Sequence, residues 1–163
     1  MGNFKTRYLP WGELPQNTLG RIVSRQWKKR LERISNEKIE AVKNLELRYD
    51  LKIYIVTNES HKADKHLKGI SGFALGKYIC LPDSYNLNLT VPHEGGHTLQ
   101  SEKLGWLYLP IVGISSAIFN NLWDRWFHKK WPGEKRYKWY YNRFPEKWAD
   151  ELGSVKRTYV EAS

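Results

Sequence analysis

The chain has 163 residues and a mass of 19.3 kDa, which suits one domain with its own hydrophobic core and excludes two independent domains. Its single cysteine, Cys80, excludes an internal disulfide framework and favours a reducing compartment. The formal net charge of +10 is compatible with a solvated basic surface, a nucleic-acid partner or an anionic membrane, and charge alone does not choose among them.

The start of the chain predicts an irregular arm followed by a long helix. Residues 1–17 contain Pro10 and Pro15 and no apolar segment of the secretory type, so we expect a cytoplasmic protein without a signal peptide. Thr18 is a plausible helix cap, and the residues after it predict a long N-terminal helix that opens a single domain, residues 18–163. Apolar residues recur there at helical spacing: Leu19, Ile22, Val23, Trp27, Leu31 and Ile34.

Two short apolar segments predict strands. Residues 51–57, LKIYIVT, alternate in the way that a strand with two different faces requires. Residues 72–81, GFALGKYICL, predict a second strand. Within it, Gly72 and Gly76 indicate an edge position where another backbone can approach.

The segment VPHEGGHTLQ carries the main chemical signal. On a helix, His93 and His97 lie four residues apart on one face, so both imidazoles can bind one metal ion. Glu94 is rotated by about 100° from His93, which places it near such an ion without forcing it to bind. A carboxylate there can accept a proton from metal-activated water and pass it to a leaving amine. The H-E-x-x-H pattern is a hypothesis by itself, because a polar helix with two unrelated histidines also fits it.

A second segment, FPEKWADELG, supplies two acidic residues at helical spacing. Glu146 and Asp150 lie four apart, and Pro145 suits a first helical turn. A catalytic zinc takes three protein ligands and one open position, so Glu146 would complete a set with the two histidines. Asp150 would accept the free N–H of a ligand histidine. Such acidic pairs are also common on exposed helices, and the presence of the histidine pair is what favours a metal site.

HEGGH followed by E-x-x-A-D resembles the gluzincin metallopeptidases. The chain is most similar to the small soluble minigluzincins and to the branch of HtpX-type and CAAX-processing proteases, over roughly residues 50–155. The resemblance implies a zincin-like α+β fold with a small antiparallel or mixed sheet. It further implies an active-site helix at about 90–103 and a glutamate helix at about 145–156, both after the long N-terminal helix.

The resemblance also implies a zinc-dependent peptidase, and among peptidases an endopeptidase. His93, His97 and Glu146 would hold Zn²⁺, Glu94 would be the general base, and Asp150 would support a ligand histidine. The substrate would be a peptide or protein. It would add as an extended strand to an edge strand formed by Phe73, Ala74, Leu75 and Gly76.

Two further expectations concern the site. Pro92 has no N–H, so we expect the active-site helix to begin near Thr90 with His93 in its first turn. Peptide hydrolysis also needs a donor for the negative charge that develops on the cleaved carbonyl. The sequence offers four candidates without ranking them: Tyr140, Tyr141, Arg157 and Tyr159.

Residues 104–123 contain no charged side chain, and an uncharged segment of this length could span a bilayer. Pro110 and Gly113, with several serines and asparagines, lower the hydrophobicity of this segment. A core hairpin or a wall of the substrate pocket is therefore favoured over a membrane-interface element, and a true span comes last. The segment that follows mixes aromatic and basic residues, which suits lipid headgroups or single-stranded nucleic acid.

The alternatives to this peptidase differ in their partners. One alternative is a basic protein associated with nucleic acid. This class includes the DNA-linked proteases of the SprT type, which resemble this chain in H-E-x-x-H but use a third histidine as metal ligand. His128 is the only later histidine here. An inactive zincin that acts as a binding module is another, and the intact Glu94 argues against it. For the basic charge we expect peripheral contact with an anionic membrane rather than nucleic acid, because the uncharged segment lies directly beside the aromatic and basic one.

Overall fold

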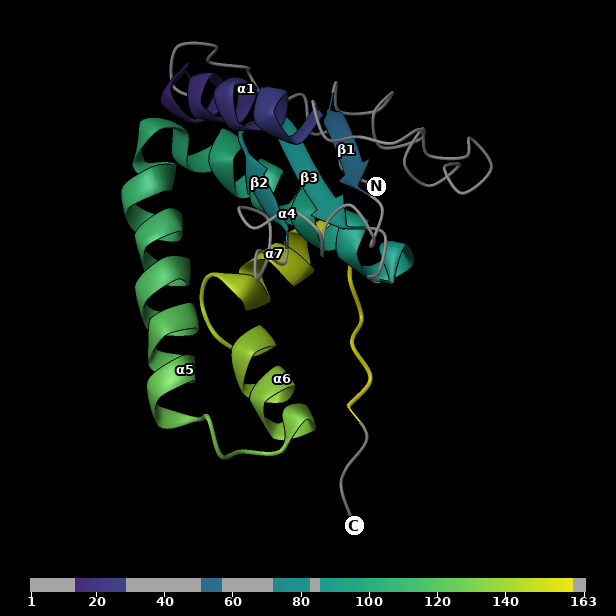
Figure 1. Ribbon diagram of the computed structural model, residues 1–163, viewed down its shortest axis with the longest axis vertical. Helices are drawn as coiled ribbons and strands as arrows, with labels where there is room; N and C mark the ends of the chain where they lie inside the picture. The colour runs from purple at the N-terminus through teal and green to yellow at the C-terminus, as the bar shows by residue number, and fades with distance from the viewer. Residues whose placement is uncertain (1–13, 29–50, 57–71, 83–85, 160–163) are drawn as a thin grey trace.

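The computed structural model describes residues 14–28, 51–56, 72–82 and 86–159 (Figure 1). In these parts of the chain, helices combine with a three-stranded mixed sheet. The predicted α+β class is therefore confirmed, and of the two predicted kinds of sheet the mixed one is present.

The sheet has the order β1-β3-β2. Strand β1 (Lys52–Val56) pairs in parallel with β3 (Tyr78–Pro82), and β2 (Phe73–Leu75) pairs with β3 in the antiparallel direction. All five residues of β3 are buried, so this central strand is covered on both faces. The apolar core around it consists of Leu51, Ile55, Ala74, Ile79, Leu81 and Val91.

The predicted second strand, residues 72–81, is wrong as a single element. It forms β2 and β3, which a tight turn at Gly76 and Lys77 joins into a hairpin. Gly76 has a φ of 56°, which favours glycine, and Asn17 accepts a hydrogen bond from the Lys77 N–H at 2.9 Å. Gly76 thus belongs to the turn. Among the described strands, β2 lies at the edge of the sheet, as expected for Phe73–Leu75.

Helix α1 (Leu14–Lys28) packs against the sheet. It begins at Leu14, so the expected irregular arm is wrong for residues 14–17; residues 1–13 lie outside the described residues, as does the expected continuation of the helix beyond 28. The helix closely approaches the hairpin at Gly20, where a Cβ atom would collide with the Leu75 carbonyl and the Tyr78 ring. This contact holds the hairpin against the N-terminal helix.

Helix α4 (Leu87–Leu104) carries the histidine pair and begins earlier than expected. Asn86 caps it by accepting a hydrogen bond from the Asn88 N–H at 3.2 Å. Pro92 therefore lies inside the helix and His93 in its second turn, so the expected start near Thr90 was wrong. At this position the proline removes the backbone hydrogen bond that its own N–H would have made.

Helices α6 (Gly133–Tyr141) and α7 (Glu146–Gly153) follow one another near the C-terminal end of the described chain (Figure 1). The glutamate helix α7 is shorter than the expected 145–156. It ends at Gly153 because Ser154 adopts a left-handed conformation with a φ of 57°.

Residues 105–127 form one continuous helical segment, here called the 105–127 helix. Two of its parts, Leu109–Gly113 and Ser115–Leu122, are π-helical, and it ends in α5 (Trp123–Phe127). Figure 1 shows it as a long green helix along one side of the molecule. The expected core hairpin is therefore wrong. Within the described ranges, no helix has both the length and the apolar character needed to cross a membrane.

Candidate metal centre

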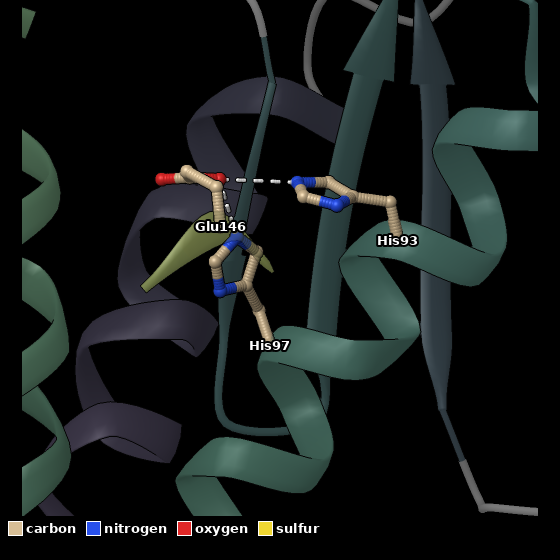
Figure 2. A group of neighbouring side chains, drawn as sticks. All are labelled: His93, His97 and Glu146. Atoms are coloured by element: carbon tan, nitrogen blue, oxygen red, sulfur yellow. Dashed lines mark hydrogen bonds and ion pairs between the residues drawn. The ribbon is translucent and has the colours of Figure 1, made fainter. Parts of the chain in front are cut away.

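Three buried side chains from two helices converge on one point: His93 and His97 from α4 and Glu146 from α7 (Figure 2). Their ligand atoms all lie within 4.8 Å of one another. Oε2 of Glu146 lies 3.2 Å from Nε2 of His93 and 3.1 Å from Nε2 of His97. This group could hold a metal ion.

Close packing of α4 and α7 brings these residues together. At Gly96 a Cβ atom would collide with the backbone of Ala149, and at Gly153 it would collide with the Pro92 carbonyl. The two helices therefore approach backbone to backbone at the level of the histidines. Residues with larger side chains at these positions would separate Glu146 from His93 and His97.

Each histidine has a second hydrogen bond that fixes the orientation of its ring. Nδ1 of His93 lies 2.7 Å from Oδ1 of Asp150, the role expected for that aspartate. Nδ1 of His97 lies 2.8 Å from Oε1 of Gln100, whose amide nitrogen donates to the Pro145 carbonyl at 2.8 Å. Because the Pro145 carbonyl only accepts, Gln100 must present its oxygen to the ring. Both Nδ1 atoms therefore donate, and both Nε2 atoms face Glu146.

The other oxygen of Glu146 is also bound. Oε1 accepts hydrogen bonds from Ser116 Oγ at 2.8 Å and from the Tyr140 hydroxyl at 3.2 Å. Sequence reasoning missed Ser116 and Gln100. Gln100 had a usable signal, since it lies three residues after His97 on the same helix. Ser116 had none, because it is thirty positions away from Glu146 in sequence.

The electrostatics of the cluster favour a positive charge at its centre. Burial alone would raise the pKa of Glu146, but hydrogen bonds from His93 and His97 hold it well below its usual range. Burial alone would lower the pKa of His93, but Asp150 and Glu146 raise it to about 9. A site that keeps Glu146 charged and stabilises a positive charge beside it suits a metal ion as well as a proton.

Glu94 faces a pocket of about 280 Å³ that also contains the three clustered residues. Burial raises the pKa of Glu94, and the neighbouring His97 and His93 oppose that shift. The pocket lies between strand β2 on one side and the 105–127 helix on the other. The expected edge strand and the expected pocket wall therefore meet at the metal cluster. The Tyr108 hydroxyl joins them by donating to the Ala74 carbonyl at 3.1 Å.

The four expected oxyanion donors separate into two pairs. Among the described residues that line the pocket are Tyr140 and Tyr141, but not Arg157 or Tyr159. Arg157 instead donates to Asp150 at 2.6 Å, while Tyr159 packs near Tyr137. Burial raises the pKa of both pocket tyrosines, so their hydroxyls stay protonated and can donate. Tyr141 also packs edge-on against His93, with ring centroids 5.2 Å apart.

His128 takes no part in the described metal-binding group. It is buried, stacks on Trp131 with ring centroids 3.8 Å apart, and lies 3.4 Å from the carboxylate of Asp124. A third histidine ligand of the SprT type would have to come from this residue. Its placement favours Glu146 as the third member of the group.

Comparisons with protein-family profiles, characterised proteins and solved structures found no match to this chain.

Proposed function

We propose that the chain is a zinc-dependent peptidase of the gluzincin type. His93, His97 and Glu146 hold the metal in this proposal, and Glu94 is the general base. The observation that carries it is the buried convergence of two Nε2 atoms on one oxygen of Glu146, 3.2 and 3.1 Å away. The ring orientations are fixed by Asp150 and Gln100.

The chemistry of this donor set fits zinc. Zinc bonds to histidine nitrogen and carboxylate oxygen are about 2.0–2.2 Å long, and tetrahedral geometry then separates neighbouring ligand atoms by about 3.3–3.6 Å. The two nitrogen–oxygen separations need only a small increase to meet that value. Two imidazoles and one carboxylate also match the three-ligand composition of catalytic zinc sites, which keep a fourth position open.

The remaining residues of the pocket supply the steps of peptide hydrolysis. When bound, zinc provides Lewis-acid chemistry, which polarises a carbonyl and lowers the pKa of water. Glu94 accepts the proton of the attacking water and returns it to the leaving amine. Tyr140 or Tyr141 donates a hydrogen bond to the developing oxyanion. An extended substrate lies along Phe73–Leu75, the edge strand beside the cluster.

The variant Glu94→Gln tests this proposal. The amide keeps the shape of the side chain but cannot carry the proton, so we expect unchanged metal content and a loss of about 10²–10⁴-fold in the rate of peptide cleavage. The matched control is Glu102→Gln, the same change on the same helix outside the pocket. Cleavage is measured on a mixture of fluorogenic peptides. Parent-like activity in Glu94→Gln would remove Glu94 from the mechanism.

A further inference from the structure

The 105–127 helix carries a row of large apolar side chains on the protein surface. Trp106 is 66 % exposed, Ile114 50 % and Trp126 76 %. We call the whole set the apolar stripe: Trp106, Leu107, Ile111, Ile114, Ile118, Leu122, Trp123, Trp126 and Phe127. Exposed apolar residues are ordinary when scattered over a surface, but their concentration on a single helix marks an interaction surface.

Other residues of the same helix are buried against the rest of the protein. Tyr108 and Val112 are buried and line the metal-site pocket, and Ser116 donates to Glu146. Ile114 and Ile118 each lie two residues from Ser116 in sequence, are about half exposed and are not among the residues that line the pocket. The helix runs along one side of the molecule (Figure 1). The exposure of the stripe and the burial of Tyr108 and Val112 give this helix an outer and an inner face.

The residues at the ends of the stripe indicate what binds it. Trp106 lies at one end, and two more tryptophans lie at the other. The exposed cations Arg125, Lys129 and Lys130 lie within or just after α5, beside Trp126. Aromatic and basic residues at the boundary of an apolar surface are typical of proteins that sit among lipid headgroups.

Charge also distinguishes a bilayer from a second copy of the chain. The whole chain carries a formal net charge of +10, so two copies repel each other, whereas an anionic lipid surface attracts each of them. No described helix is able to span a membrane, so the contact is with the surface.

We propose that the apolar stripe docks on an anionic lipid bilayer, with Ile114 and Ile118 entering the acyl boundary and Lys129 and Lys130 among the headgroups. The contact goes beyond the proposed peptidase activity and does not require the metal. The inner face of the 105–127 helix keeps its contacts with the pocket when the outer face is bound.

Flotation with phosphatidylcholine vesicles, prepared with and without phosphatidylglycerol, tests the proposal. The parent chain should float with the anionic vesicles. The double variant Ile114→Asp/Ile118→Asp should bind them at least about tenfold more weakly, because two apolar groups are replaced by charges. The double variant Lys129→Ala/Lys130→Ala should bind them about 25-fold more weakly, at about fivefold for each lysine.

The matched control is Ile22→Asp on α1, since Ile22 is 55 % exposed and lies outside the stripe. It should float like the parent. Circular dichroism of each variant separates a lost surface from a lost fold. Flotation of the parent equally with neutral and anionic vesicles would overturn the role of charge. Three further results would overturn the proposal: no flotation, a concentration-dependent dimer without flotation, or a gel shift on single-stranded DNA without flotation.

Discussion

The metal cluster and the apolar stripe depart from ordinary burial in opposite directions. In the cluster, polar groups are buried: His93 is 4 % exposed and Glu146 2 %. On the stripe, large apolar groups are exposed. Buried polar groups destabilise a fold unless they are hydrogen-bonded. A large apolar surface that is exposed in the isolated chain marks a site that a partner covers.

The difference shows how each region is stabilised. Every member of the cluster also has a hydrogen-bond partner outside the cluster, so the fold itself orients these side chains. Among the described residues, the 105–127 helix is anchored through its inner face, and the exposed apolar stripe contributes little to folding. We therefore expect substitutions in the cluster to change stability and metal affinity, and substitutions on the stripe to change association.

The largest effect on stability is expected at Gly96. An alanine there would overlap the backbone of Ala149, and we expect Gly96→Ala to lower the free energy of unfolding by about 3 kcal/mol. Gly95→Ala is the matched control. Its Cβ meets no atom within 4 Å, and removing a helical glycine stabilises by up to about 1 kcal/mol. Urea denaturation measures both. Equal stability of the two variants would refute the close helix packing.

The next effect concerns the support of His93. Asp150→Ala removes the acceptor of the Nδ1–H, and zinc affinity should fall by about 10–100-fold. Asp124→Ala is a close control, because Asp124 also lies beside a histidine, His128, and an arginine, Arg136. It should leave zinc affinity unchanged. Competition with a chromophoric chelator measures the zinc affinities. If both variants lost the same affinity, the loss would come from general destabilisation and not from the contact with His93.

The smallest effect compares the two faces of the 105–127 helix. Val112 is 2 % exposed and Ile114 50 %. Val112→Ala should lower the free energy of unfolding by about 2 kcal/mol, while Ile114→Ala should change it by less than about 0.5 kcal/mol in the absence of lipid. Chemical denaturation of both proteins checks this. A larger loss for Ile114→Ala would show that the stripe belongs to the core.

The residues of the metal cluster could be predicted because helices convert sequence spacing into shared faces. His93 and His97 lie four apart, as do Glu146 and Asp150. The expected contact of Asp150 with one of the two histidines is present, at His93. The sequence could not supply Ser116, because its contact with Glu146 depends on how the 105–127 helix packs.

The fold was predicted less well where one or two residues change the direction of the chain. The apolar segment 72–81 predicted one strand, but the positive φ of Gly76 makes it a hairpin. Asn86 was an available cap for α4, yet Pro92 drew the expected start toward Thr90. The uncharged segment predicted a core hairpin or a pocket wall. It forms a helix that lines the pocket with one face and exposes apolar residues on the other.

Metal analysis of the purified chain tests the central claim most directly. After exhaustive dialysis, elemental analysis of the parent should find close to one zinc per chain, because two imidazoles and a carboxylate converge in a buried site. Glu146→Ala should lose that zinc. The control Glu134→Ala, at an exposed position on α6, should retain it. A parent chain without bound metal, or a Glu146→Ala variant with its full complement of zinc, would contradict the assignment of the site.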